Sequence, residues 1–179
     1  MNLILSVDEH WALGKQNQLL FRVAPDLQMF KERTMDGVVI MGRKTWESLP
    51  NGNPLPGRVN IILSRNPEAV SLPKTETQIM LCKDLEGLSI SLDQLRLPTQ
   101  KVWVIGGAEI YKMLMPYCEA AYVTRFFASD PEGDCWMEQL SNLATWVLEE
   151  QGDRQEWEGF GFCFERYRNL DVKPLPHPV

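Results

Sequence analysis

The stretch that most constrains the fold runs from Val38 to Pro50 and reads VVIMGRKTWESLP. Its first four residues are apolar, and two adjacent β-branched valines are typical of a buried strand. Gly42 then allows the chain to turn, and Arg43 begins a short helix that Pro50 ends. The sequence therefore predicts a strand that leads through glycine into a helix, which is the basic unit of an α/β fold.

The junction between this strand and this helix is also a candidate anion site. The first N–H groups of a helix lack partners and the helix dipole is positive there, so a phosphate is favoured, and Arg43 and Lys44 add full charges. Ser64 and Arg65 follow the next predicted strand and could share the same phosphate if the two strands are neighbours. A glycine kept for packing and ordinary surface arginines are the alternative interpretation.

The segment from Lys101 to Tyr111, KVWVIGGAEIY, has the same organisation. A predicted buried strand is followed by Gly106 and Gly107, which allow a ligand to approach the backbone closely, and by a helix that begins at Ala108. The pattern is not the GxGxxG fingerprint of a Rossmann domain. A dinucleotide site here would therefore have another design.

The rest of the chain adds strands and helices around these two units. Further strands are predicted at residues 2–7, 59–65, 78–82, 120–127, 145–149 and 157–168, and further helices begin at Pro25 and near residue 85. Because the last strands follow one another closely, we expect an antiparallel edge on an otherwise parallel sheet. Residues 8–24 show no sustained period, so we expect either a functional lid or a loop that covers the core.

Composition limits the class of function. The chain has 179 residues, enough for one domain, and a formal net charge of −6 that argues against broad nucleic-acid binding. Four scattered cysteines and two histidines indicate neither a zinc site nor a disulfide framework. The apolar start is too short for a membrane span, so the expected location is the reducing cytoplasm. We expect a single domain over residues 1–171 and a proline-rich tail over 172–179 that runs along the surface.

Asp26, which follows Pro25 at the start of a predicted helix, is a candidate functional acid. It lies four residues before Phe30, so the carboxylate and the ring can share a helix face directed toward the sheet. Most acids in a first turn are solvated, and this interpretation stays open. If the carboxyl points into an apolar pocket, burial raises its pKa and makes it a proton donor or a hydrogen-bond anchor.

Taken together, IMGRKTWESLP, PLPGRVNIILSR, VIGGAEIY and the helix that carries Asp26 and Phe30 resemble the dihydrofolate reductase family in content, order and spacing. The resemblance covers nearly the whole chain. It implies an α/β fold with a mostly parallel eight-stranded sheet, an antiparallel C-terminal edge, flanking helices and an NADPH adenosine-binding subdomain at residues 37–95. The implied reaction is hydride transfer from NADPH to C6 of 7,8-dihydrofolate with a proton added at N5, which supports one-carbon metabolism and thymidylate synthesis.

By position, the resemblance implies that Asp26 binds the pterin N3 and 2-amino group and assists protonation through water. Arg58 matches the arginine that pairs with the α-carboxylate of the glutamate, and Thr124 matches a threonine that is hydrogen-bonded near the acid. The carbonyl groups of Ile4 and Ile105 are expected to face the pteridine. The other residues expected along the substrate cleft are Leu5, Leu27, Phe30, Ser48 and Leu55.

The resemblance likewise implies which residues hold NADPH. The 2′-phosphate would be bound by Arg43, Ser64 and Arg65, which makes NADPH the expected donor rather than NADH. The pyrophosphate would be lined by Lys44, Thr45, Gly106, Gly107, Ala108 and Glu109, and Gly42 and Tyr111 complete this set. The nicotinamide and its ribose would lie near Ser6, Leu13, Gly14 and Leu19. The Gly106–Gly107 peptide bond is expected to be cis, as in the family.

Three departures from the family pattern stand out. Leu20 and Phe21 replace the Pro-Trp pair that commonly precedes the helix of the acid, so an indole N–H that helps to fix a water there is missing. Cys135 and Met137 stand where the later loop commonly has threonine and proline, and Ser6 is the small residue near the end of the first strand. We expect these changes to alter lid dynamics and antifolate response more than the reaction.

Two other interpretations stay open. A related pyrimidine reductase of riboflavin synthesis shares the fold and NADPH but reduces a phosphorylated sugar, and it should not need Asp26, Phe30 and Arg58 in this arrangement. A non-catalytic NADPH- or folate-binding protein could keep the fold without turnover. We expect a monomer that acts on a small molecule and that binds no metal, nucleic acid or membrane.

Overall fold

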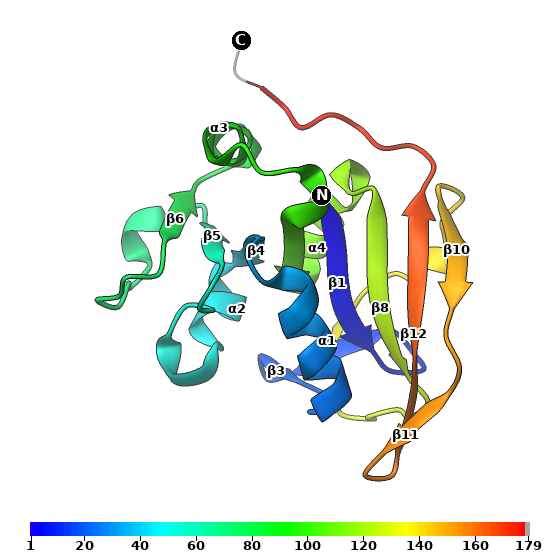
Figure 1. The fold of residues 1–179 in the computed structure, drawn as a ribbon. Coiled ribbons are helices and arrows are strands. Elements are labelled where there is room, and N and C mark those ends of the chain that lie inside the picture. Colours follow the sequence, from blue (N-terminus) through cyan, green and yellow to red (C-terminus); the bar gives the residue numbers. More distant parts are fainter. Residues whose placement is uncertain (178–179) are drawn as a thin grey trace.

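The fold is known from a computed structural model, which describes residues 1–177, and its centre is one large sheet (Figure 1). The strands follow the order β10-β12-β8-β1-β7-β4-β5-β6, and β11 pairs with β12. The strands of this sheet are β1 (Asn2–Val7), β4 (Val38–Gly42), β5 (Val59–Leu63), β6 (Ile79–Cys82), β7 (Val102–Gly106), β8 (Ala120–Phe126), β10 (Trp146–Gln151), β11 (Gln155–Trp157) and β12 (Phe160–Asn169). The α-helices are α1 (Ala24–Thr34), α2 (Arg43–Glu47), α3 (Leu85–Leu95) and α4 (Ala108–Leu114).

The strand directions agree with the sequence-based prediction. β1 is parallel to β7 and β8, and the strands from β7 through β4 and β5 to β6 are parallel as well. β12 is antiparallel to β8, and both β10 and β11 are antiparallel to β12. The predicted mostly parallel sheet with an antiparallel C-terminal edge is confirmed.

Helices cover both faces of the sheet, which explains the continuous apolar runs in the central strands. In β4, Val38 and Ile40 belong to the apolar cluster that includes residues of α3 and α4, whereas Val39 and Met41 belong to the cluster that includes residues of α1 and α2. Successive side chains of a strand point to opposite faces, so a strand buried on both sides needs apolar residues at every position.

Residues 8–24 are more regular than the sequence predicted. β2 (Ala12–Lys15) and β3 (Gln18–Leu19) form a hairpin, and β2 also pairs with β9 (Cys135–Trp136), so the three strands make a second, small sheet. The prediction of an irregular loop was wrong here. Two of the strands have only two residues each, and β9 lies far along the chain, so no local period marks this sheet.

The predicted strand over residues 157–168 is interrupted. β11 ends at Trp157, and the chain turns through Glu158 and Gly159, which have φ angles of 48° and 86°, before β12 begins at Phe160. Positive φ at both central residues is the geometry of a tight hairpin turn. The continuous strand was therefore a wrong prediction, although the Glu-Gly pair was the local signal for the turn.

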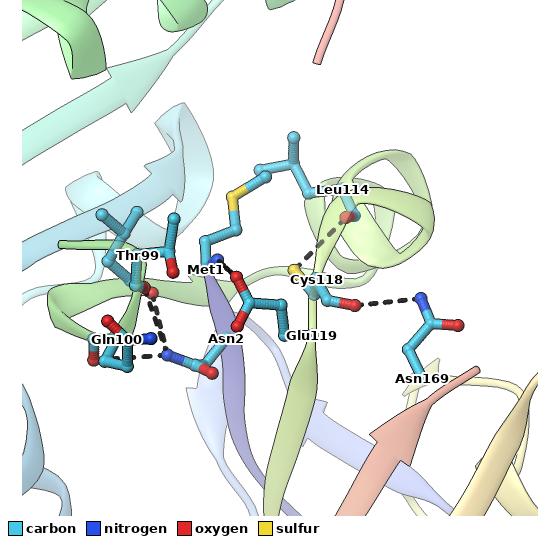
Figure 2. Close-up of polar contacts among 9 residues, drawn as sticks. Met1, Asn2, Thr99, Gln100, Leu114, Cys118, Glu119 and Asn169 are labelled. Carbon is cyan, nitrogen blue, oxygen red and sulfur yellow. Dashed lines mark hydrogen bonds and ion pairs between the residues drawn. The ribbon is translucent and has the colours of Figure 1, made fainter. Parts of the chain in front are cut away.

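A polar cluster joins the chain segments at the amino-terminal end of β1 (Figure 2). The Asn2 side-chain amide donates to the carbonyl groups of Thr99 and Gln100 over 3.4 and 3.3 Å. Close by, the Asn169 amide donates to the Cys118 carbonyl over 2.9 Å. These bonds tie the start of β1 to the segment before β7, and the end of β12 to the segment before β8.

The tail runs along the surface, as predicted, and it is anchored there. It crosses the top of the molecule from the end of β12 toward α3 (Figure 1). The Lys173 N–H donates to the Pro116 carbonyl over 2.9 Å, Leu175 packs against the main apolar cluster, and the His177 ring is hydrogen-bonded to Ser89. Residues 178 and 179 lie outside the described part of the chain.

Residues 1–177 contain neither a candidate membrane-spanning helix nor a candidate metal site. None of the helices there has the length and hydropathy that a membrane crossing requires. Within the same residues, no three His, Cys, Asp or Glu side chains are grouped as metal ligands. All four cysteines are free thiols, of which Cys82, Cys118 and Cys163 are buried.

The anchored tail makes a prediction about stability. Full burial of a leucine contributes roughly 1.5–3 kcal/mol, so Leu175→Ala, at a partly buried position, is expected to lower the free energy of unfolding by about 1–2 kcal/mol. Leu170→Ala is the control because Leu170 is 54% exposed, and we expect a change within about 0.5 kcal/mol. Urea unfolding of both variants measures this, and equal effects would show that the tail only rests on the surface.

Candidate active site

The two glycine turns meet at the carboxyl ends of neighbouring parallel strands. β4 and β7 pair directly, which brings Gly42 and Gly106 to the same edge of the sheet. A Cβ atom on Gly107 would lie 3.5 Å from Thr45 Oγ1, and a Cβ atom on Gly42 would lie only 2.8 Å from Ile110 Cγ1. The Gly106–Gly107 peptide bond is cis, as expected. Glycine at position 42 therefore lets the β4 turn pack against α4.

Asp26 lies in the first turn of α1 and points inward. The residue is only 6% exposed, and the fully buried Thr124 of β8 donates its hydroxyl to Asp26 Oδ1 over 2.6 Å. Burial raises the pKa of Asp26, and the hydrogen bond from Thr124 opposes that rise in part. The solvated interpretation of this acid is thus excluded, and the expected contact with Thr124 is present.

Tyr111 of α4 feels the charge of Asp26 and is hydrogen-bonded to β1. Its hydroxyl donates to the Ile4 carbonyl over 2.8 Å. Burial raises the pKa of Tyr111, and the charge of Asp26 raises it further. The phenol therefore stays protonated, remains a donor, and fixes α4 relative to the end of β1.

An apolar cluster lies on the face of the sheet that α1 covers. Four residues that were expected along the substrate cleft belong to a single apolar cluster on the α1 face of the sheet: Ile4, Phe30, Leu55 and Ile105. They come from β1, α1, the loop before β5, and β7. Segments far apart in the sequence thus converge on the α1 face of the sheet, and Asp26 is carried by the same helix as Phe30.

Three other expected cleft residues lie outside this cluster. Leu27 is 42% exposed on α1, and Ser48 is half-buried and donates its hydroxyl to the Thr45 carbonyl over 2.8 Å. Leu5 is buried in the cluster on the opposite face of the sheet. Their contacts with substrate stay predictions.

Arg58 is held in a fixed position beneath α1. The residue is 8% exposed, and its Nε donates to the Pro56 carbonyl over 2.9 Å. Its Nη1 donates to Thr34 Oγ1 over 3.0 Å, and the Thr34 hydroxyl donates to the Phe30 carbonyl over 2.8 Å. Burial lowers the pKa of Arg58, but a guanidinium still remains charged at any physiological pH.

Asn60 is a residue of this site that the sequence analysis did not single out. It is fully buried in β5, and its amide donates to the Leu55 and Arg58 carbonyl groups over 3.0 Å each. Its Oδ1 accepts from the Leu55 N–H over 2.9 Å. Asn60 therefore shapes the loop that presents Leu55 and Arg58. The available signal was an amide in an otherwise apolar strand.

The residues expected at the 2′-phosphate lie at adjacent strand ends. β4 pairs with β5, so Arg43, just after β4, and Ser64, just after β5, are neighbours in the sheet order. Arg43 forms an exposed ion pair with Glu47 over 2.7 Å, Arg65 is exposed, and the Ser64 hydroxyl donates to the Asn66 carbonyl over 3.0 Å. The structure brings the expected set to one edge, with Arg65 exposed at the surface.

The other expected cofactor residues are divided between β1, α2, α4 and the lid loop, by which we mean residues 8–24. Lys44 and Glu109 are exposed, whereas Thr45, Ala108 and Ser6 are half-buried. In the lid loop, Leu13 packs against the main apolar cluster, Gly14 is buried and Leu19 is 45% exposed.

The lid loop is tied to the later loop at two points. Asp134 accepts from the Gln16 N–H over 2.8 Å, and its own N–H donates to the Gly14 carbonyl over 3.1 Å. Nearer the sheet, the buried Asp8 carboxylate accepts from the Ala12 N–H over 2.8 Å and from the Asp130 N–H over 3.2 Å. Asp8 was not predicted, because its second partner lies far along the chain.

Phe21, where the family commonly has tryptophan, packs into an aromatic cluster. Its ring centroid lies 4.8 Å from that of Phe126 and 5.1 Å from that of Phe160. Val23 and Phe162 are buried in the same cluster. The end of the lid loop is therefore attached to β8 and β12 by apolar contacts.

Two surface cavities lie around Arg33 of α1 and Tyr122 of β8. Their volumes are about 290 and 420 Å³, and none of the predicted site residues lines them. The Arg33 guanidinium lies 4.2 Å from the Tyr122 ring centroid, and Arg166 and Arg168 both pair with Glu149. Each of these arginines thus has a partner within the protein, an aromatic ring for Arg33 and a carboxylate for Arg166 and Arg168, so the candidate chemistry remains with Asp26.

A sequence model of a family described as Dihydrofolate reductase matches residues 1–169. The chain belongs to the dihydrofolate reductase family. The dihydrofolate reductase of Drosophila melanogaster is 31% identical over 176 residues, which cover 88% of this chain and 94% of that protein. That of Bacillus subtilis is 32% identical over 169 residues and 93% of each chain.

A solved dihydrofolate reductase has the same fold. The enzyme from Enterococcus faecalis, complexed with NADP(H) and RAB-propyl, superposes with a TM-score of 0.74 over 95% of this chain and 96% of its own, at 23% identity. Dihydrofolate reductases are NADPH-dependent oxidoreductases that act on a small-molecule substrate, and this chain is an enzyme of that class. The comparisons favour neither the pyrimidine reductase nor the non-catalytic alternative.

The buried acid predicts a pH-dependent effect on stability. The pKa of Asp26 in the folded protein lies above the unfolded value of about 3.9, so folding favours the protonated carboxyl, and this contribution is lost as pH rises from about 4 through the raised pKa. Asp26→Asn should therefore raise the melting temperature at pH 8, and the gain should shrink toward pH 4. Thermal unfolding across this range is the measurement, with the exposed Asp153→Asn as control. A gain that does not depend on pH would contradict the shifted pKa.

Proposed function

We propose that this dihydrofolate reductase uses Asp26 as its single acidic group to reduce 7,8-dihydrofolate, with hydride added at C6 and a proton at N5. The observation that supports this most directly is the buried Asp26 carboxyl, which accepts a hydrogen bond from Thr124 and lies on the same helix as Phe30 of the apolar cluster. A pterin is a flat, polar ring system, so a carboxyl beside an apolar wall can bind its N3 and 2-amino edge while the ring packs on hydrocarbon.

Each residue then has a limited task. The raised pKa keeps a proton available on Asp26 nearer to neutral pH, which suits a group that assists protonation, here through a water molecule. Phe30, Leu55 and Ile105 orient the ring and exclude bulk water. Bound NADPH would supply the hydride, so no protein group needs to be oxidised or reduced.

The cofactor residues fit a phosphorylated dinucleotide at the sheet edge. We propose that Arg43, Ser64 and Arg65 bind the 2′-phosphate and that the turns of Gly42 and Gly107 receive the pyrophosphate. The remaining proposed cofactor contacts are Ser6, Leu13, Gly14, Leu19, Lys44, Thr45, Gly106, Ala108, Glu109 and Tyr111. The support is that Gly42, Ser64 and Gly106 lie at the carboxyl ends of the neighbouring parallel strands β4, β5 and β7, where ligands of open α/β sheets bind.

The organisation of the chain is part of the same proposal. Residues 1–171 would form the reductase domain, with the adenosine-binding subdomain at 37–95 and residues 172–179 as its tail. We propose a monomer that works in the cytoplasm and binds no nucleic acid. The formal charge of −6 and the small size of both ligands support this arrangement.

The first test is loss of NADPH absorbance when 7,8-dihydrofolate is added. Asp26→Asn should lower kcat by about 100-fold or more, because a positioned acid contributes roughly that factor. The wild-type rate should fall as pH rises through the raised pKa of Asp26, whereas the variant should lack this titration and recover only toward acid, where the substrate itself is protonated. Cofactor that binds but stays unoxidised would contradict the proposed reaction.

A second test concerns the choice of cofactor. Arg65→Ala removes an exposed cation from the proposed 2′-phosphate site, so the preference for NADPH over NADH, measured as the ratio of kcat/KM values, should fall about 10-fold. Arg96→Ala, an exposed arginine at the end of α3, is the matched control. If both variants keep the wild-type preference, Arg65 does not bind the phosphate.

A further inference from the structure

We propose that the larger of the two surface cavities, beside Arg33 of α1, is a binding site for a phosphate group, either free or carried by a small metabolite. The cavity has a volume of about 420 Å³ and lies at the amino-terminal ends of β1, β7 and β8. The glycine turns of the candidate active site lie at the carboxyl ends of β4 and β7 instead. The cavity is therefore separate from the proposed cofactor turns, and its ligand does not depend on the proposed reaction.

The sheet forms the floor of this cavity. The strand register places Asn2 of β1 beside Trp103 of β7 and beside Ala120 of β8. Ala120 is paired in turn with Arg168 of β12, and all four residues line the cavity. Paired residues of neighbouring strands point to the same face of a sheet. The short side chain of Ala120 therefore leaves space between the longer ones of the same row.

Three guanidinium groups line the cavity, and each keeps N–H donors for a ligand. Arg33 lies 4.2 Å from the Tyr122 ring centroid and forms no hydrogen bond within residues 1–177, so its five N–H groups are available. Arg166 pairs with Glu149 through Nη1 and Arg168 through Nε, which leaves their other nitrogens. Guanidinium groups bind phosphate through several N–H groups in a fixed planar arrangement. Their gathering in one cavity therefore favours a phosphate group.

The acidic side chains near the cavity already have partners. Glu119 is the one acid in its lining within residues 1–177, and its carboxylate contacts the Met1 amino group over 3.4 Å (Figure 2). Glu149 and Glu150 pair with the arginines of β12. Arg33 has no carboxylate partner in the same part of the chain, so an anion is favoured here although the whole protein has a formal charge of −6.

A buried donor without a partner is a second, independent indication of a ligand. Trp103 is 5% exposed, and its indole Nε1–H has no acceptor within residues 1–177. Buried N–H groups without a partner cost free energy and are rare in folded proteins. The Trp103 ring also packs on Tyr122, with 5.3 Å between the ring centroids. A phosphate in the cavity would bring acceptor oxygens beside this ring.

The size of the cavity allows more than a phosphate ion. Sites for small molecules commonly have volumes of about 300–1,000 Å³ and combine apolar surface with a few polar groups. Here Tyr122 and Trp103 supply the rings and the arginines supply the charge. The site therefore suits a small phosphate monoester as well as inorganic phosphate.

The experiment follows the indole N–H resonance of Trp103 by NMR in the NADPH-bound protein, so that the cofactor's own phosphate site is occupied. Trp103→Phe assigns the resonance. The probes are inorganic phosphate and glycerol 3-phosphate, each compared with potassium chloride at the same ionic strength. We expect a saturable shift of the Trp103 resonance with at least one phosphate probe and none with chloride. The indole N–H of Trp11 is also unpartnered, but it lies beside Tyr167 in the main apolar cluster, so its resonance should not move.

Two variants test the role of charge at this site. Arg33→Gln should raise the Kd of the bound probe about 10-fold or more, and the fold should tolerate it because Arg33 is exposed. Arg154→Gln is the matched control, because Arg154 is also exposed and lies 4.8 Å from the ring centroid of Phe127, away from the cavity. Its Kd should stay within about twofold of wild type. Arg168→Gln is a second variant of the lining and should weaken binding as well.

The two probes distinguish the sources of the phosphate group. A lower Kd for glycerol 3-phosphate would support a phosphorylated metabolite, and a Kd for inorganic phosphate that is equal or lower would support the free ion. A shift that does not saturate, or that chloride reproduces, would overturn the inference, and so would an unchanged Kd in both Arg33→Gln and Arg168→Gln. Absence of dihydrofolate turnover would overturn only the proposed reaction.

Discussion

The burial of one carboxyl group, Asp26, is the constraint on which the rest of the site depends. An acid away from water is costly unless it is hydrogen-bonded or neutral, and Asp26 is 6% exposed with a single hydroxyl partner, Thr124. Helix α1 must therefore keep its contact with Thr124 of β8, and the residues around the carboxyl must remain apolar. Burial of Asp26 is unfavourable for its charged form and raises its pKa. A raised pKa is the property that a proton donor needs.

The two ends of the cleft are built differently. Around the acid, apolar residues from four segments converge, and their exact partners matter less than their volume. Around Arg58, by contrast, Asn60 and Thr34 hold the loop and the guanidinium through directional hydrogen bonds, all of them buried or partly buried. An apolar wall can orient a flat ring, but recognition of a carboxylate requires donors in fixed directions.

The lid loop carries one of the departures from the family pattern, Phe21. The side chain of Phe21 has no N–H to offer a water molecule, and its ring instead packs against the rings of Phe126 and Phe160. The Asp8 carboxylate accepts from the Asp130 N–H and the Asp134 carboxylate accepts from the Gln16 N–H, and these bonds join the same loop to the segment before β9. The position of the lid loop therefore depends on apolar packing at one end and on backbone hydrogen bonds at the other.

The sequence by itself determined the parallel units, their glycine turns and the identity of the family, because apolar runs, glycine and helix signals are local and appear in a readable order. Only the tertiary structure decided that Asp26 is buried, that β2 and β3 pair with β9, and that Asn60, Thr34 and Asp8 support the site. The physical reason is that burial and hydrogen-bond partners depend on residues far apart in the chain. The local sequence around an acid in a first helical turn is the same whether water or β8 lies beside its carboxyl group.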